Sequence, residues 1–361
     1  MSNALPQHAP LLQFPVKDDC LHIGGIALTQ LVQRVGTTPF YAYGRQQITD
    51  RVALLRQALP SEIQLHYAMK ANPMPAVVQH LASLVDGIDV ASVGEMKVAL
   101  DTPMSPGSVS FAGPGKKEHE LRCAIAAGVL LNVESPQEMT LIARLGNSLG
   151  IQPRVAIRIN PNFELKSSGM KMGGGPKPFG VDAECVPDLL KQISGLGLEC
   201  IGFHIFSGSQ NLNAAAIQDV HEKTVQLAIR LAEYAPSSIK LINMGGGFGI
   251  PYFPGERSLN LPLIGENLQR LSMILKQHLP AARIALELGR YIVGEAGIYV
   301  CRILERKLSR GQMFLVTDGG LHHHLAASGN FGQVIRKNYP VIIGNKVYGA
   351  EREVVSVVAA S

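Results

Sequence analysis

Eight short strand-like runs, each divided from the next by a helical pattern, constrain the fold of this chain more than any other feature. The runs are residues 64–68, 87–90, 109–111, 130–133, 154–159, 198–205, 240–243 and 283–287. Between them, apolar residues recur at helical spacing, as Ile264, Leu268 and Leu271 do on one face. This alternation favours a parallel sheet, and eight such units close into an α/β fold, the (β/α)8 TIM barrel. A doubly wound open sheet is the alternative, but no Gly-x-Gly-x-x-Gly motif follows an early strand.

The two chain ends lack this alternation and predict a second domain. Residues 1–38 and 296–361 carry short apolar runs interrupted by acidic pairs, glycines and prolines. Strands are expected there at 298–304, 313–317 and 341–347. We therefore predict a barrel domain over 39–295 and a discontinuous β-rich domain formed by 1–38 together with 296–361.

Composition and charge exclude several classes of partner. A hydrophobic content of 46% and a charged content of 17% are typical of a globular enzyme, and no apolar run is long enough to cross a bilayer. The formal charge of +5 is spread thinly, without a basic block, so neither nucleic acid nor a membrane is an expected partner. Residues 1–10 lack the pattern of a signal peptide. The five cysteines are odd in number and scattered, which favours reduced thiols and a cytoplasmic location.

Lys70 lies at the mouth of the first strand, within Tyr67-Ala68-Met69-Lys70-Ala71-Asn72. Pro73 breaks the strand, and residues 74–84 are expected to form a helix with Pro75 in its first turn. A lysine at such a junction can be desolvated enough to act as an amine nucleophile and to hold an aldehyde as a Schiff base. From this stretch alone an ordinary lysine beside a loop is the simpler interpretation, so the other strand ends must decide.

The other strand ends bring polar and glycine-rich groups to the same rim, where barrel enzymes place their chemistry. In chain order these groups are Asp89, Arg158, His204, Gly245-Gly246-Gly247, Glu287 and Gly289-Arg290. Three successive glycines let backbone amides approach an anion, typically a phosphate, to which Gly289 and Arg290 could add donors. Glu287 is either a structural ion-pair partner, for example of Arg158, or a carboxylate that keeps a heterocyclic nitrogen protonated.

The run His322-His323-His324 raises the question of a metal ion. Adjacent residues of a strand point to opposite faces, so three consecutive histidines are a poor ligand set. We expect no metal site.

Five motifs at these strand ends occur in an order and spacing shared with one known family. They are YAMKAN at 67–72, GIDVAS at 87–92, HIFSGSQ at 204–210, NMGGGFGIPY at 243–252 and ELGR at 287–290. As a set they resemble the fold-type III pyridoxal-phosphate decarboxylases, the diaminopimelate and ornithine decarboxylase family. A later stretch, DGGLHHHLAASGNFG at 318–332, resembles the subgroup associated with the exosortase A system.

The resemblance implies an alanine racemase-like barrel, pyridoxal 5′-phosphate as cofactor and a homodimer with shared active sites. Lys70 would carry the cofactor as a Schiff base, Asp89 would support both, and Glu287 would pair with the pyridine nitrogen. Arg158 would tie Glu287 to its surroundings. The phosphate would be held by Ser209, Gly245, Gly246, Gly247 and Arg290, and Gly289 would belong to the same cofactor site.

Three departures from the family pattern limit this transfer. Many relatives stack a histidine on the pyridine ring, but the aligned residue here is Phe206, with His204 on the same strand face as a partial substitute. The arginine that reads a substrate carboxylate in diaminopimelate decarboxylases is missing at 324–327, which argues against meso-diaminopimelate, although Arg336 could serve a differently placed acid. Relatives also continue into a segment with a cysteine, an acid and a tyrosine, so we expect an incomplete β domain.

The leading hypothesis is a pyridoxal-phosphate-dependent α-decarboxylase of a free or carrier-linked amino acid, with Lys70, Glu287 and His204 as its catalytic residues. An amino-acid racemase on the same fold is the alternative, but racemases usually have a weakly protonated ring nitrogen, which a carboxylate disfavours. A third possibility is a catalytically degenerate cofactor-binding protein, given the missing C-terminal elements.

Overall fold

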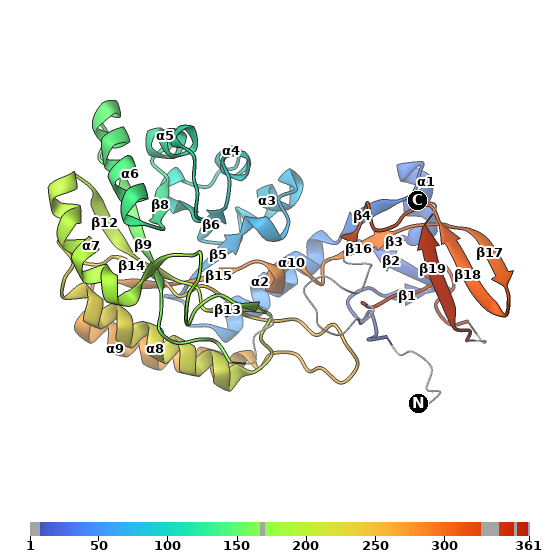
Figure 1. The fold of residues 1–361 in the computed structure, drawn as a ribbon. Coiled ribbons are helices and arrows are strands. Elements are labelled where there is room, and N and C mark those ends of the chain that lie inside the picture. The colour runs from blue at the N-terminus through green and yellow to red at the C-terminus, as the bar shows by residue number, and fades with distance from the viewer. Residues whose placement is uncertain (1–7, 167–169, 326–338, 350–351, 360–361) are drawn as a thin grey trace. The chain divides into compact units, whose positions relative to one another are not determined.

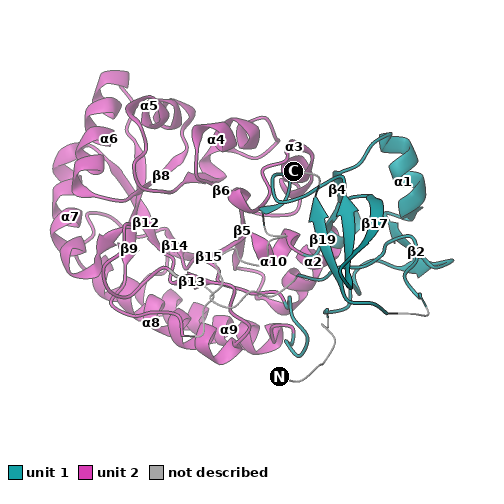
Figure 2. Ribbon diagram, turned by 45° about the vertical axis from the view of Figure 1, so that its right-hand side comes forward, with its two compact units in different colours: residues 1–48, 251–257, 295–361 teal, residues 49–250, 258–294 magenta. Residues whose placement is uncertain are grey.

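The computed structural model of the chain describes residues 8–166, 170–325, 339–349 and 352–359 (Figure 1). The chain forms two compact units (Figure 2). One unit comprises residues 1–48, 251–257 and 295–361, and the other comprises 49–250 and 258–294. The domain boundaries expected from the sequence stay a prediction.

The larger unit is a closed barrel of eight parallel strands, which confirms the predicted fold. In chain order the strands are β5 (Gln64–Ala68), β6 (Gly87–Val90), β7 (Val109–Phe111), β8 (Leu130–Val133), β9 (Arg154–Asn160), β12 (Glu199–Ile205), β14 (Leu241–Asn243) and β15 (Arg283–Leu288). The ring is closed where β15 pairs with β5, with Leu288 opposite Tyr67. Nearly every strand residue is buried, as expected for parallel strands covered by helices.

Helices surround the barrel strands (Figure 1). They are α2 (Arg45–Ala58), α3 (Pro75–Leu81), α4 (Val93–Leu100), α5 (Glu118–Ala127), α6 (Pro136–Leu149), α7 (Val186–Ile193), α8 (Ala214–Ala232), α9 (Leu261–His278) and the short α10 (Arg290–Val293). Local sequence sets their ends. Ser92 and Ser135 cap α4 and α6 by accepting the amides of Glu95 and Glu138, and Pro75 begins α3 as predicted.

Three two-residue strands lie in the loops after β9 and β12. They are β10 (Met170–Lys171), β11 (Val181–Asp182) and β13 (Gly208–Ser209). β11 extends the barrel sheet beside β9, and β10 pairs antiparallel with β13. They therefore tie the long loop after β9 to the loop after β12.

The smaller unit is a β structure built from segments near both ends of the described chain, as predicted. Its strands are β1 (Val16–Lys17), β2 (Cys20–Ile23), β3 (Ile26–Ala27), β4 (Phe40–Tyr43), β16 (Gly297–Val300), β17 (Ile303–Ser309), β18 (Gln312–Thr317) and β19 (Val355–Ala359). β4 pairs with β16, and β18 pairs with both β17 and β19. Phe14, Leu21, Leu28 and Val300 are buried together in its core.

The structure corrects three sequence predictions for this unit. Residues 341–347 form no strand, because a turn closed by Lys346 and Ile343 interrupts the segment and its amides and carbonyls bond singly to residues 19–21. The strand expected over 298–304 is two strands, β16 and β17. An amphipathic helix, α1 (Leu28–Val35), follows β3 where only strands were expected.

Candidate active site

Lys70 lies just beyond the carboxyl end of β5, in a single turn of 3-10 helix, Met69–Ala71. Its side chain is 58% exposed, and Nζ lies 3.3 Å from Oε1 of Glu287. The same nitrogen lies 5.4 Å from the centre of the Phe206 ring. Lys70 is therefore an accessible amine held between a carboxylate and an aromatic ring.

Glu287, near the carboxyl end of β15, is buried and lies between the Lys70 amine and the His204 imidazole. Its Oε1 faces Lys70, and its Oε2 lies 3.0 Å from Nε2 of His204 on β12. Burial alone would raise the pKa of Glu287, but the charge of Lys70 and the contact with His204 outweigh it. The pKa therefore lies well below its usual range, and Glu287 is a buried anion.

His204 and Phe206 come from the same end of the same strand. His204 is buried, and Phe206 follows two residues later, just past the end of β12. The Phe206 ring approaches Lys70, whereas the His204 ring approaches Glu287. Phe206 therefore lies beside the Lys70 amine, and His204 lies beside the Glu287 carboxylate.

Asp89 at the end of β6 does not contact Lys70 among the described contacts. Its Oδ1 lies 3.3 Å from Nδ1 of His66 and accepts a short hydrogen bond from Ser110. Burial alone would lower the pKa of His66, but the charge and hydrogen bond of Asp89 raise it. Any support that Asp89 gives to Lys70 is therefore not a direct bond in this structure.

The glycine loop after β14 passes close to the strand that carries Glu287. A Cβ on Gly246 would lie 2.0 Å from the carbonyl oxygen of Glu287, so a side chain cannot be accommodated there without movement. Gly245 and Gly247 have φ values of 66° and 86°, which favour glycine. The Gly245 amide donates to Oδ1 of Asn243, whereas the amides of Gly246 and Gly247 have no acceptor within the described residues.

Gln210, Arg290 and Gly289 complete the same rim. Nη1 of Arg290 donates to Oε1 of Gln210 at 3.4 Å, and Nε2 of Gln210 donates to the carbonyl of Ile250 at 2.6 Å. A Cβ on Gly289 would lie 2.9 Å from Cβ of Ala71. Gly289 therefore lets the end of β15 pass close to the turn that carries Lys70. Ser209 lies in β13, one residue before Gln210.

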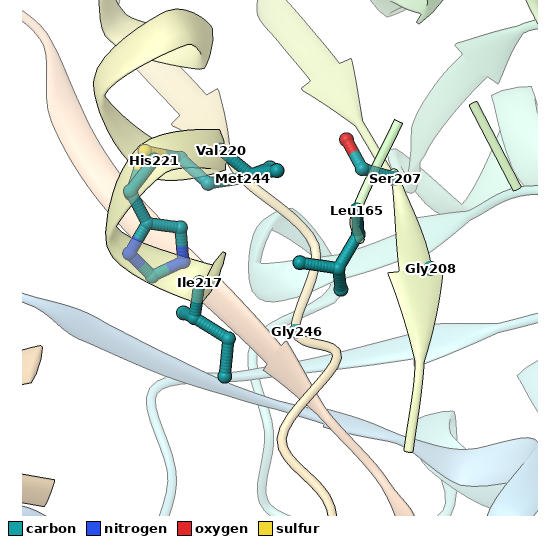
Figure 3. A pocket seen from close by; sticks show the side chains of 8 residues that line it. All are labelled: Leu165, Ser207, Gly208, Ile217, Val220, His221, Met244 and Gly246. Carbon is teal, nitrogen blue, oxygen red and sulfur yellow. The ribbon is translucent and has the colours of Figure 1, made fainter. Parts of the chain in front are cut away.

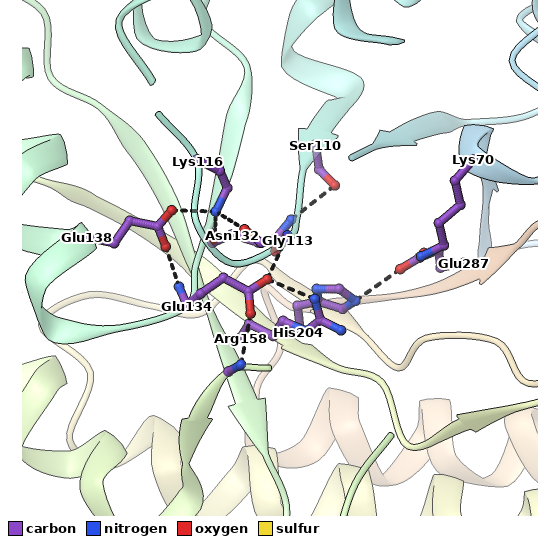
Figure 4. Close-up of polar contacts among 11 residues, drawn as sticks. Lys70, Ser110, Gly113, Lys116, Asn132, Glu134, Glu138, Arg158, His204 and Glu287 are labelled. Carbon is purple, nitrogen blue, oxygen red and sulfur yellow. Dashed lines mark hydrogen bonds and ion pairs between the residues drawn. The ribbon is translucent and has the colours of Figure 1, made fainter. Parts of the chain in front are cut away.

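The ion pair between Arg158 and Glu287 that the sequence suggested is not present. Instead, Nη1 of Arg158 lies 2.8 Å from Oε1 of Glu134 (Figure 4). Glu134 was not among the site residues expected from the sequence. Arg158 acts on Glu287 through space only, as one of the charges that lower its pKa. Glu134 follows β8 directly, so the strand-end rule that selected Asp89 would also have selected it.

Residues 45–294 match the family model of the pyridoxal-dependent decarboxylases, pyridoxal binding domain. The chain belongs to the pyridoxal-dependent decarboxylase family. Its cofactor is therefore pyridoxal phosphate.

Two relatives illustrate the chemistry of the family. The chain is 36% identical over 324 residues to the L-glutamyl-[BtrI acyl-carrier protein] decarboxylase of Niallia circulans, covering 87% of this chain and 74% of that protein. It is 34% identical over 321 residues to the diaminopimelate decarboxylase of Aquifex aeolicus, covering 88% and 74%. The crystal structure of the M. jannaschii diaminopimelate decarboxylase in co-complex with L-lysine superimposes with a TM-score of 0.86 at 26% identity, covering 96% of this chain and 81% of that one.

The rim of this decarboxylase-family barrel fits the cofactor chemically. Lys70 offers an accessible amine for an aldehyde, and Glu287 offers a buried negative charge for a ring nitrogen. Gly246 and Gly247 offer backbone amides of the kind that bind a phosphate. An aldehyde, a basic ring nitrogen and a phosphate are the three polar ends of pyridoxal phosphate.

A small cavity lies behind the glycine loop of this decarboxylase-family chain (Figure 3). Its lining comprises Leu165, Ser207, Gly208, Ile217, Val220, His221, Met244 and Gly246. The His221 imidazole is buried, and neither ring nitrogen has a hydrogen-bond partner among the described residues. Burial lowers the pKa of His221 to about 4, so the ring is neutral at pH 7.

Within the described part of the chain, no group of three or more His, Cys, Asp or Glu side chains is arranged to hold a metal ion. The rings of the histidine run contact each other and aromatic neighbours, since His324 stacks on Tyr299 with 5.3 Å between ring centres. None of the helices in the described residues is both long and apolar enough to span a membrane. Arg336 and most of 324–332 lie outside the described residues.

Proposed function

We propose that Lys70 holds pyridoxal phosphate through its amine and that the chain removes the α-carboxylate of an amino acid as carbon dioxide. The observation that carries the proposal is the 3.3 Å contact between Nζ of Lys70 and the buried, ionised Glu287, at the rim of a pyridoxal-dependent decarboxylase barrel. When bound, the cofactor supplies an electron sink for the bond that breaks.

Residues of this chain would set the protonation state of the cofactor ring. Glu287, as a buried anion, would keep a proton on the ring nitrogen facing it, because neutralising the pair by deprotonation would leave the carboxylate uncompensated. His204 would orient Glu287 through its contact with Oε2. Phe206 would cover one face of the ring by aromatic stacking and exclude water from it.

The phosphate would be held by groups gathered at one side of the rim. We assign this role to Ser209, Gly245, Gly246, Gly247, Gly289 and Arg290. The support is the positive φ of Gly245 and Gly247, the amides of Gly246 and Gly247, which have no acceptor among the described residues, and the bond from Arg290 to Gln210. Asp89 would support Lys70 and the cofactor, with its carboxylate held in place by the contacts with His66 and Ser110.

Decarboxylation is favoured over racemisation by the same carboxylate. A racemase benefits from a ring nitrogen without a full positive charge, whereas Glu287 stabilises the protonated form. The named relatives are decarboxylases as well.

We propose a free or carrier-linked amino acid as substrate. Among the relatives, one is named for diaminopimelate and one for a glutamyl group on an acyl-carrier protein, so both forms are candidates. A homodimer and a cytoplasmic location are further proposals. The second is supported by the five cysteines, all of which are free thiols in the structure.

Reduction by borohydride followed by a carbon dioxide assay tests the proposal. Borohydride should fix pyridoxal phosphate to a peptide containing Lys70, and the Lys70→Ala chain should show neither the adduct nor the long-wavelength absorbance. Carbon dioxide should appear with diaminopimelate, with glutamate or with a glutamyl-carrier thioester. A trapped adduct on another lysine overturns the assignment, and an adduct without turnover of any of these substrates supports a degenerate binding protein instead.

A further inference from the structure

Glu134 is the most heavily bonded buried carboxylate among the described residues of the barrel rim (Figure 4). Its Oε1 accepts from Nη1 of Arg158 at 2.8 Å and from the amide of Gly113 at 2.7 Å. Its Oε2 accepts from the amide of Gly180 at 2.8 Å. Burial alone would raise the pKa of Glu134, but the charge and hydrogen bond of Arg158, the charge of Lys116 and the Gly180 amide outweigh it and keep the pKa below its usual range. Glu134 is therefore a second buried anion beside the site, and it is fully bonded.

Neighbouring bonds fix the position of Glu134 itself. Its amide donates to Oε2 of Glu138 at 2.7 Å, and Oε1 of Glu138 accepts from Nζ of Lys116 at 2.6 Å. Lys116 also donates to the carbonyls of Gly113 and Asn132. The loops after β7 and β8 are thus joined in one network, from which only Glu134 contacts Arg158.

Arg158 stands beside the catalytic cluster in the sheet. In the register of β9 and β12, Arg158 lies directly opposite His204, whose ring contacts Glu287 at 3.0 Å. Its guanidinium also lies 4.9 Å from the centre of the Phe179 ring. The positive charge of Arg158 already acts on Glu287 through space and helps to lower the pKa of Glu287. A buried guanidinium that loses its carboxylate must find another one, since an uncompensated buried charge is strongly destabilising. Glu287 is the buried anion that contacts His204, the residue opposite Arg158.

We propose that Glu134 is a positioning residue that holds the Arg158 guanidinium away from Glu287, so that Glu287 keeps its charge for the ring nitrogen. A guanidinium bound to Glu287 would neutralise it and would occupy the oxygens that Lys70 and His204 face. The catalytic part of this inference rests on the proposed function. The hold on Arg158 does not, and it can be observed in the cofactor-free chain.

The decisive variant is Glu134→Gln, which keeps the size of the side chain and removes its charge. In a crystal structure of the cofactor-free full chain, we expect an Arg158 nitrogen within 3.5 Å of a Glu287 oxygen. If Arg158 stays on residue 134, the inference is wrong, whatever the activity of the chain. Should E134Q not fold, Glu134→Ala, which also removes the carboxylate, replaces it, and an Arg158 side chain that stays away from Glu287 in that variant overturns the inference.

Activity supplies a second, independent test through a double variant. E134Q should lower kcat at least tenfold, and adding Arg158→Gln should restore most of the loss, because no guanidinium then remains to occupy Glu287. A merely structural role for Glu134, as a clamp on Gly113 and Gly180, predicts no recovery in E134Q/R158Q, and that result overturns the inference. Glu138→Gln is the matched control, since it weakens the same network without touching Arg158 and should leave Arg158 on Glu134.

If no variant and no wild-type chain releases carbon dioxide, the proposed function fails, and the crystallographic criterion still decides the role of Glu134.

Discussion

Among single residues, the site depends most on Glu287, a carboxylate placed between the Lys70 amine and the His204 imidazole. Oε1 of Glu287 faces the Lys70 amine and Oε2 faces the His204 imidazole, and both the carboxylate and the imidazole are buried. One contact from the turn after β5 and one from β12 hold the carboxylate, whereas a single contact would let it rotate. Its charge is thus fixed in place before any cofactor arrives.

Replacing Glu287 by Gln should lower kcat about 10²–10³-fold, because the neutral amide no longer stabilises the protonated ring as charge develops. The amount of pyridoxal phosphate bound, measured by absorbance, should change little, since Lys70 and the phosphate contacts remain. Glu118→Gln, an exposed change on α5, is the control. An unchanged kcat in Glu287→Gln would sink the assignment.

His221 should make the stability of the chain depend on pH. Its pKa is about 4 in the folded chain and about 6.5 when unfolded, so the unfolded state binds more protons between these values. The free energy of unfolding should therefore fall as the pH drops from 6.5 to 4, by about 3 kcal/mol in all from this group. Denaturant unfolding across this range should show a smaller slope for His221→Leu than for the wild type. Thr224→Val, another buried polar change on α8, should keep the wild-type slope.

At the scale of elements, the glycine loop after β14 is held against β15. Gly246 passes so close to the backbone of Glu287 that the loop and the catalytic carboxylate share one position. A shift of the loop must therefore also move Glu287.

Gly246→Ala should accordingly destabilise the chain by about 1–3 kcal/mol and weaken pyridoxal phosphate binding, because a Cβ 2.0 Å from a carbonyl oxygen forces the two segments apart. Gly195→Ala is the matched control, since its Cβ meets no atom within 4 Å and its φ is not positive. Thermal unfolding and cofactor titration measure both effects. Equal behaviour of the two variants would show that the close approach has no energetic importance.

The elements that were predictable from sequence are those whose pattern is local. The run at 64–68 coincides with β5, and Lys70, His204 and Glu287 meet because parallel strands end at one rim. The partner of Arg158 could not be predicted, since Glu134 and Glu287 are both carboxylates at strand ends and spacing does not separate them. The absence of a strand at 341–347 could not be predicted either, because the bonds of this segment are single tertiary contacts to residues 19–21, which a local sequence pattern does not reveal.

For the molecule as a whole, the chain forms two compact units, and the smaller one has a hydrophobic core of its own. The residues proposed to bind the cofactor all belong to the barrel unit, 49–250 and 258–294. Cofactor binding should therefore stabilise the barrel unit directly.

Calorimetry should show two unfolding transitions, of which only one rises with added pyridoxal phosphate. At a free concentration 100 times Kd, the stabilisation of that transition should be about 2.7 kcal/mol. Limited proteolysis during heating can assign the moving transition to the barrel. A single transition that shifts as one would contradict this independence.

The pairing of β4 with β16 joins residues 40–43 to residues 297–300, with the whole barrel between them in the chain. During synthesis, β15 leaves the ribosome before β16, so the barrel can close while β4 has no partner. At about 5–20 residues per second, the synthesis of the chain between β4 and β16 takes roughly 10–50 s. Throughout it β4 is an open edge able to pair with a foreign strand. Chaperone capture of the nascent N-terminal segment during this interval should therefore raise the yield of this protein.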